Sequence, residues 1–171
     1  MVLLLMLCVI PAQCLIEAQA YGGTRNNERK YAYVKLNGVA VWQASMNGEF
    51  SNRRGVNVIV VDTSSCTLRD WRNFDTYRSN YAANHLNSYL RGLSDGTVLV
   101  VVTCDEASRY LREAYSTLRE FGADVSDVRH RGAWVFVAEK GDPASTVLDK
   151  ELYEESAARR QPQVAASIAG A

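Results

Sequence analysis

The chain contains three short, almost continuous apolar runs, and each has the length of one buried β-strand. Strands covered on both faces carry such runs, whereas a strand with one face in water alternates between apolar and polar residues. We therefore predict buried strands over the runs Val56–Val61, Val98–Val102 and Trp134–Ala138. In the last run, Trp134 and Phe136 alternate with two valines, so we expect both rings in the core.

Two hairpins are predicted from turn chemistry. The dipeptide Asn37-Gly38 separates two β-rich runs within Tyr31–Trp42. Asn-Gly suits a type I′ turn because both central residues of that turn need a positive φ. The run Val56–Val61 is followed by polar turn residues and then by a candidate returning strand, Leu68–Phe74.

The apolar spacing changes to a helical period in two places. Apolar residues recur every three or four positions over Asn80–Leu93 and over Ala107–Phe121, which predicts two amphipathic helices. Ser79 precedes the first at the N-cap position, and Gly122 follows the second where a left-handed C-cap belongs. The mixed order of strands and helices, without regular βαβ alternation, predicts a single α+β domain with hairpins.

The N-terminal region differs from the rest of the chain. The apolar run Met1–Ile10 is too short to span a bilayer and fits the core of a signal peptide. An A-x-A cleavage pattern lies at Ala18–Ala20, and a second candidate lies at Ala12–Cys14. We expect residues 1–20 to be a signal peptide and residues 21–30 a flexible segment. The alternatives to secretion are a short membrane anchor or a misassigned start.

The C-terminal region, residues 142–171, lacks a clear apolar pattern. Ala144–Arg160 favours a helix by composition but has a poor apolar face, and Gln161–Ala171 is rich in alanine and glutamine. We therefore predict a tail that is partly helical and partly disordered.

Four cysteines are present, and cleavage at either candidate position would remove Cys8 and Cys14. The remaining pair, Cys66 and Cys104, could form a disulfide in an oxidising compartment or could be two small buried side chains. Each follows the end of a predicted strand. If the strands run parallel and close, the two cysteines could meet at the Cα separation of about 4.4–6.8 Å that a disulfide needs. Antiparallel strands would place them about 15–20 Å apart, and we favour the absence of a bond.

Composition excludes some classes of function. The chain has 19 Lys and Arg and 19 Asp and Glu, so it shows no basic excess for nucleic acid. It contains no nucleophile elbow, phosphate-binding glycine loop, metalloprotease motif or cysteine–histidine cluster at metal spacing. We expect neither an enzyme nor a cofactor, and no membrane span once the signal peptide is removed.

An acidic pair, Asp105-Glu106, follows the second buried strand. Together with Thr103, Glu106 matches a capping box, in which both side chains satisfy free backbone N–H groups at a helix start. We therefore expect Glu106 to serve the helix and Asp105 to point outward. A facing catalytic pair is disfavoured, because adjacent residues at a helix start point in different directions.

Two arginines, Arg54 and Arg131, each precede a buried strand. Such residues are usually solvated at the rim of a sheet, but with Asp105 they could instead form a small polar cluster. Asp105 follows its strand whereas both arginines precede theirs. The three can meet only if the middle strand runs antiparallel to both others, or crosses them at one end.

Five short motifs follow one another within residues 31–141. They are Arg54-Gly-Val-Asn-Val-Ile-Val-Val-Asp62, Phe74-Asp-Thr-Tyr77, Asp95-Gly-Thr-Val98, Asp105-Glu-Ala-Ser108 and Trp134-Val-Phe-Val with Lys140-Gly141. In this order they resemble the ILEI/PANDER domain of the interleukin-like EMT inducer and pancreatic-derived factor. This domain also forms the stem of protein O-linked-mannose N-acetylglucosaminyltransferase and occurs in some hyaluronan-related cell-surface proteins. The resemblance implies one compact α+β domain over 31–141, with two small, mostly antiparallel sheets and two or three helices.

The resemblance to the sugar-binding stem also implies a ligand site. The family's ligand-holding positions fall on Arg54, Asp105 and Arg131, and all three residue types are retained. A carboxylate can accept from sugar hydroxyls, and arginines can donate to hydroxyl or N-acetyl oxygens. This implies a secreted, lectin-like module whose partner is a glycan or glycoprotein with an N-acetylhexosamine-type sugar. Gly132 replaces the usual aspartate of the last motif, which weakens the Arg131 site.

Two other functions follow from the same resemblance. The chain could be a secreted cytokine-like protein that binds a cell-surface receptor, although those members carry two disulfides and the cysteines here lie at other positions. It could also be a stem fragment of a glycosyltransferase-like protein, which would place it in the Golgi lumen.

Overall fold

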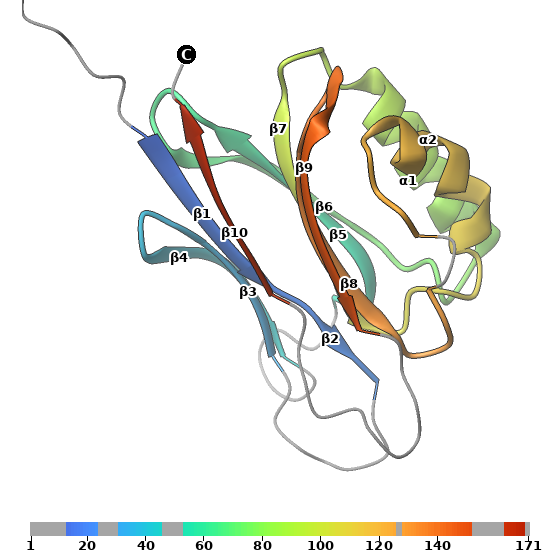
Figure 1. Ribbon diagram of the computed structural model, residues 1–171. Helices are drawn as coiled ribbons and strands as arrows, with labels where there is room; N and C mark the ends of the chain where they lie inside the picture. The colour runs from blue at the N-terminus through green and yellow to red at the C-terminus, as the bar shows by residue number, and fades with distance from the viewer. Residues whose placement is uncertain (1–12, 24–30, 46–52, 126–127, 152–162, 170–171) are drawn as a thin grey trace, which may run out of the picture.

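The computed structural model describes residues 13–23, 31–45, 53–125, 128–151 and 163–169 of the chain. Two β-sheets face each other, and the helices cover the outer side of the larger sheet (Figure 1). All but one of the strand pairings in this part of the chain are antiparallel. The predicted α+β class with two mostly antiparallel sheets is confirmed.

The smaller sheet has four strands in the order β10-β1-β3-β4. Its strands are β1 (Gln13–Gln19), β3 (Tyr31–Leu36), β4 (Val39–Ser45) and β10 (Gln163–Ala169). The first predicted hairpin is confirmed, since β3 and β4 are joined at Asn37 and Gly38. Their φ angles of 48° and 80° are both positive, as a type I′ turn requires.

The larger sheet has the order β6-β5-β7-β8-β9, and a short strand, β2, pairs in parallel with the end of β7. Its strands are β2 (Tyr21–Gly22), β5 (Gly55–Asp62), β6 (Thr67–Phe74), β7 (Val98–Asp105), β8 (Ala133–Glu139) and β9 (Asp142–Glu151). The three predicted buried strands lie within β5, β7 and β8, and the predicted returning strand forms β6. Because β7 runs antiparallel to both β5 and β8, the condition for the polar cluster is met.

The larger sheet is buried on both faces, which explains its continuous apolar runs. One face packs against the smaller sheet, where Ile16 and Val100 are fully buried. The other face packs against the helices, where Leu86 is fully buried beside Trp134 and Phe136. The rings of Trp134 and Phe136 are stacked with centroids 5.2 Å apart. Their predicted place in the core is confirmed.

The first predicted helix is confirmed as α1 (Asn80–Gly92). The Ser79 hydroxyl accepts a hydrogen bond from the Ala82 N–H at 3.3 Å, as an N-cap should. At the other end, the Lys140 ammonium donates to the Arg91 carbonyl oxygen at 2.7 Å. This positive charge favours the C-terminal end of the helix dipole.

The second predicted helix, Ala107–Phe121, forms only in its later part. The observed elements are the 3₁₀-helix η1 (Leu111–Ala114) and the helix α2 (Tyr115–Glu120). The predicted start is wrong because Thr76 bonds the backbone there: its hydroxyl donates to the Ala107 carbonyl, and its carbonyl accepts from the Tyr110 N–H. Gly122 has a φ of 80°, so the predicted left-handed end is confirmed.

The predicted capping box is also wrong. The Thr103 hydroxyl exchanges hydrogen bonds with the backbone N–H and carbonyl of Trp134 at 2.8 and 3.0 Å. No helix begins at this position, because β5 and β2 both pair with the last residues of β7 and extend the strand to Asp105. Glu106 therefore has another role, described below.

The predicted signal-peptide boundary after Ala20 conflicts with the structure, because residues 13–22 belong to the folded domain. Alternate side chains of β1 lie in the core between the sheets. Tyr21, expected in a flexible segment, is only 2% exposed. The apolar run Met1–Ile10 lies outside the described residues, so the leader itself stays a prediction.

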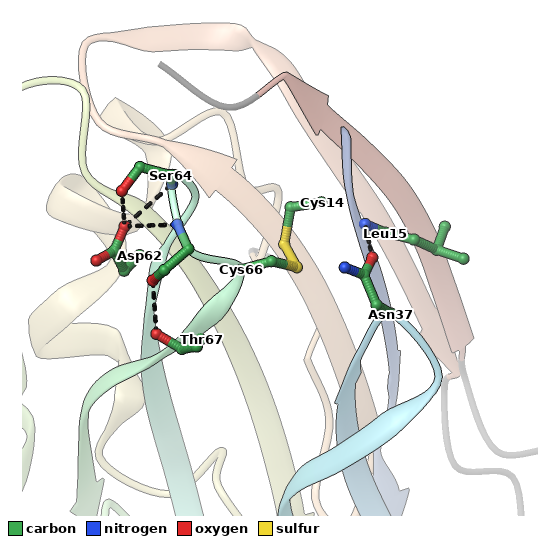
Figure 2. The surroundings of a disulfide bond; sticks show 8 residues. Cys14, Leu15, Asn37, Asp62, Ser64, Cys66 and Thr67 are labelled. Atoms are coloured by element: carbon green, nitrogen blue, oxygen red, sulfur yellow. Dashed lines mark hydrogen bonds between the residues drawn. A yellow bond between two sulfur atoms is a disulfide. The ribbon is translucent and has the colours of Figure 1, made fainter. Parts of the chain in front are cut away.

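A disulfide joins the two sheets between Cys14 in β1 and Cys66 in the β5–β6 turn, with Cα atoms 5.2 Å apart (Figure 2). Beside it, the Asn37 side chain accepts a hydrogen bond from the Leu15 N–H at 3.0 Å. Cleavage at either candidate position would therefore remove this bond from the mature chain. Cys104 is buried and free, which agrees with the expected absence of a bond to Cys66.

The predicted helical or disordered tail is wrong where it is described. Residues 142–151 form β9, which pairs with β8, and residues 163–169 form β10, which pairs with β1. Val164 is 7% exposed and completes the core between the sheets. Pairing with an existing sheet outweighs the weak helix propensity of this region.

Candidate ligand-binding site

The three predicted ligand residues lie at one end of the larger sheet. Asp105 is the last residue of β7, and Arg54 precedes β5 at the register position Gly55–Cys104. Arg131 precedes β8, and the pairing between β8 and β7 begins with Val135 opposite Val102. The antiparallel arrangement thus places the end of one strand beside the starts of its two neighbours.

The side chains of Asp105 and Arg131 both lie next to Gly23. A Cβ atom added to Gly23 would lie 2.7 Å from Oδ1 of Asp105 and 2.9 Å from Cγ and Cδ of Arg131. Gly22 approaches even more closely, since its Cβ would lie 2.1 Å from the Arg131 carbonyl oxygen. Both positions require glycine because the backbone of Gly22 and Gly23 lies directly against the two site residues.

The backbones of Asp105 and Arg131 are both left-handed, with φ angles of 60°. Aspartate tolerates this conformation, but for arginine it is uncommon. Such conformations persist only where the surrounding structure holds them, and they gather at functional sites. The two side chains are therefore aimed by a backbone that is fixed from outside the pair.

Arg54 is anchored by a bidentate ion pair with Asp75, at 2.8 Å from Nη2 to Oδ2 and 3.1 Å from Nε to Oδ1. Its guanidinium lies 4.7 Å from the ring centroid of Tyr77, and that of Arg109 lies 5.5 Å from the same ring. A guanidinium has five N–H donors, and contacts among the described residues use two of those of Arg54, which leaves three for other acceptors in this part of the chain.

The charge on Asp105 is only partly compensated. Burial raises the pKa of its carboxyl, whereas the nearby Arg131 and Arg54 guanidinium groups act in the opposite direction and Glu106 adds to the rise. Within the described residues, however, neither arginine forms an ion pair with Asp105, and no hydrogen bond reaches its carboxylate. Asp105 thus has two positive charges nearby but no ion pair with either among the described residues.

Glu106, expected to cap a helix, is instead 3% exposed and holds two turns together. Its Oε1 accepts from the N–H and the hydroxyl of Ser108 at 2.7 and 2.6 Å. Its Oε2 accepts from the Arg131 N–H and lies 2.8 Å from Nδ1 of His130.

The sequence prediction missed several residues that surround the three charged side chains. Gly22 and Gly23 were assigned to a flexible segment, although a glycine pair beside an aromatic residue is a signal for close backbone approach. Tyr77 belongs to the motif Phe74-Asp-Thr-Tyr77, but no local signal marks its ring as a neighbour of Arg54. His130 and Glu106 contact each other only through the tertiary fold.

A second concave surface lies on the smaller sheet and does not include the cluster. It is lined mainly by side chains of β3 and β4, among them Tyr31, Tyr33, Lys35 and Gln43. The chemistry of the three charged residues at the end of the larger sheet therefore does not depend on this hollow.

A sequence model of the family described as interleukin-like EMT inducer matches residues 54–142, just over half of the chain. The chain belongs to this family. The match confirms the predicted ILEI/PANDER resemblance, and it begins at Arg54 and includes Asp105 and Arg131. Residues 13–23, which supply β1 and β2, lie before the matched range.

Several known proteins are similar to this chain in sequence. The cell migration-inducing and hyaluronan-binding protein of Homo sapiens is 38% identical over 102 residues, which cover 58% of this chain and 8% of that protein. Protein FAM3A of Mus musculus is 32% identical over 104 residues, covering 60% and 42% of the two chains. Protein FAM3C of Bos taurus is 32% identical over 101 residues, covering 58% and 44%. In each case the match spans less than half of the relative.

Across the part of the chain that the structure describes, no helix has the length and apolar character needed to cross a membrane.

Proposed function

We propose that this ILEI domain is a secreted, non-enzymatic glycan-binding module that recognises an N-acetylhexosamine-type sugar through Arg54, Asp105 and Arg131. One observation carries the proposal. The Asp105 carboxylate and the two guanidinium groups lie close enough to influence each other, yet no ion pair joins them within the described residues. A ligand with both donors and acceptors can bridge them.

Sugar chemistry fits this arrangement. A half-buried carboxylate without hydrogen bonds gains free energy when hydroxyl groups donate to it. Within the described residues no acceptor is bound to the guanidinium of Arg131. Its N–H groups, and those of Arg54 not used by Asp75, can donate to hydroxyl, ring or N-acetyl oxygens. A sugar offers both kinds of group on one rigid ring.

The proposal assigns no catalytic step to this site. Glycoside hydrolysis uses two carboxylates that flank the scissile bond. Here Asp75 is bound to Arg54 and Glu106 is buried in contacts with Ser108 and Arg131. Asp105 is therefore the one carboxylate of these three that remains open to a ligand.

Secretion is part of the same proposal. The Cys14–Cys66 disulfide joins the two sheets, and such bonds persist in oxidising compartments. This supports an extracellular location, with the Golgi lumen as the alternative. One relative, the cell migration-inducing and hyaluronan-binding protein, is named for binding a glycan, which supports a glycan partner for the shared domain.

The proposal is tested by titrating oligosaccharides that end in N-acetylhexosamine into the labelled domain and recording backbone amide shifts by NMR. We expect Asp105→Asn to weaken binding at least about tenfold, as loss of a charged hydrogen-bond partner does. Asp62→Asn is the matched control, because Asp62 ends β5 at the opposite end of the same sheet. Absence of any wild-type shift near Asp105, or full affinity in Asp105→Asn, would contradict the proposal.

A second candidate is a cytokine-like ligand for a cell-surface receptor. It is favoured by the family description and by the similarity to proteins FAM3A and FAM3C. Binding of the labelled domain to cells separates the two candidates. A glycan partner predicts that enzymatic removal of surface glycans abolishes binding, whereas a protein receptor predicts that protease treatment does so and glycan removal does not.

A further inference from the structure

A buried carboxylate lies directly behind the proposed site. Glu106 is 3% exposed, and all its described partners belong to the two turns that follow β7 and precede β8. These partners are the Ser108 N–H, the Ser108 hydroxyl, the Arg131 N–H and the His130 imidazole. No lysine or arginine side chain forms an ion pair with Glu106 among the described residues.

Burial of such a group needs a structural reason. A buried carboxylate is costly unless hydrogen bonds satisfy it, and an apolar residue of similar size is often equally stable. An apolar side chain, however, cannot accept a hydrogen bond from the Arg131 N–H. That N–H belongs to a residue in the left-handed region, which arginine adopts only when its surroundings hold it there.

We infer that Glu106 is the positioning residue of this site: by accepting the Arg131 N–H, it fixes the left-handed backbone of Arg131. It thereby sets the separation between the Arg131 guanidinium and the Asp105 carboxylate. The role of this separation in binding rests on the proposed function, whereas the hold on the Arg131 backbone does not.

A neighbouring residue provides a matched control. Thr103 is 1% exposed and also ties β7 to the start of β8, through its two hydrogen bonds with Trp134. Among the described residues, its side chain forms hydrogen bonds with Trp134 and none with Arg131. Thr103→Val therefore removes a buried polar tie of the same kind without changing the backbone of the proposed site.

The test compares Glu106→Gln and Thr103→Val with the wild type. The glutamine amide has one acceptor oxygen, so its NH₂ group must face either the Ser108 donors or the Arg131 N–H. We expect Glu106→Gln to speed hydrogen exchange of the Arg131 amide, and to weaken binding of N-acetylhexosamine oligosaccharides, each by about tenfold. Thr103→Val should lower the urea midpoint and leave both the exchange of that amide and the affinity unchanged.

The exchange measurement needs no ligand, so it separates this inference from the proposed function. If the wild type binds no glycan, the proposed function fails, and exchange of the Arg131 amide alone decides whether Glu106 holds that backbone. Unchanged exchange in Glu106→Gln overturns the inference. A wild type that binds glycan and a Glu106→Gln variant of equal affinity also overturn it.

Should Glu106→Gln fail to fold, Ser108→Ala replaces it. This change removes one of the two hydrogen bonds that orient Oε1 and leaves the bond between Oε2 and Arg131 in place. We then expect a smaller change in the same direction, about threefold in exchange and in affinity. The inference is overturned if neither the exchange rate of the Arg131 amide nor the affinity changes.

Discussion

At the residue scale, the site is set by the left-handed backbones of Asp105 and Arg131 and by the glycine between their side chains. Each left-handed residue costs about 1–3 kcal/mol unless neighbouring groups hold it. Glu106 holds Arg131 through its N–H, and Gly23 donates its own N–H to the Asp105 carbonyl. These hydrogen bonds offset the free-energy cost of the left-handed backbone, and neither involves the side chains of the charged cluster.

The first prediction concerns Gly23. Gly23→Ala should destabilise the fold by about 1–3 kcal/mol and weaken glycan binding, because the new methyl group would overlap Asp105 and Arg131. Gly92→Ala is the control: a Cβ there meets nothing within 4 Å, so the gain in helix propensity should stabilise by up to about 1 kcal/mol. Urea unfolding measures both; equal effects of the two changes would contradict the crowding argument.

The second prediction concerns the charge of Asp105. Burial raises the pKa of its carboxyl in the folded protein, despite Arg131 and Arg54. The folded state therefore binds more protons, and stability falls as pH rises from the unfolded pKa of about 3.9 through the folded pKa. Asp105→Asn removes the charge, and asparagine tolerates a positive φ.

We therefore expect Asp105→Asn to be more stable than the wild type at about pH 7, and the difference to shrink below about pH 3.9. Urea unfolding at the two pH values measures it. A wild type that is the more stable of the two at neutral pH would show that the arginines outweigh burial.

At the scale of the elements, the end of β7 organises the molecule. β5 pairs along one edge of β7, while β8 and then β2 pair along the other, so the last residues of β7 are surrounded by backbone. The disulfide adds a second connection, between β1 and the turn that joins β5 to β6. The Asp62 carboxylate stabilises that turn by accepting from the Ser64 N–H and hydroxyl at 3.0 and 2.6 Å (Figure 2).

The third prediction concerns this disulfide. Its cysteines are 52 residues apart, and closing a loop of that length stabilises a fold by about 2–4 kcal/mol. Reducing agent should therefore lower the urea midpoint of the wild type, and replacing both Cys14 and Cys66 by alanine should lower it by a similar amount. The double variant should no longer respond to reductant, and a wild type that does not respond either would contradict the bond.

At the scale of the whole molecule, two cores share the larger sheet. The smaller sheet closes one core and the helices close the other. β1 is central to the first core because it lies between β10 and β3. The segment expected to be removed as a leader is therefore needed for the fold that presents the site.

The fourth prediction concerns the start of the domain. A chain that begins at Tyr21 loses β1, its disulfide and the buried Ile16 side chain, a loss of more than about 5 kcal/mol. It should show no cooperative unfolding. A chain that begins at Gln13 keeps β1 and should unfold cooperatively. Thermal melting followed by circular dichroism compares them, and a cooperative transition in the shorter chain would show that β1 is dispensable.

Much of the fold follows from local sequence. The valine runs of β5, β7 and β8 predict strands because both faces of these strands are apolar, and Asn37-Gly38 predicts its turn from backbone preference alone. The positions of Arg54, Asp105 and Arg131 beside strand ends are also visible in the sequence. The sequence positions alone do not show whether the three residues lie at the same end of the sheet, because that depends on the direction of β7.

Tertiary structure decided the rest. β1, β2, β9 and β10 have weak local signals and form strands because neighbouring strands offer free backbone groups. Glu106 matches a helix cap in sequence, but the pairing that extends β7 leaves no helix there to cap. Its carboxylate instead bonds to Arg131, 25 residues away. A hydrogen bond between such distant residues forms only when packing brings them together, and no local pattern of residues encodes it.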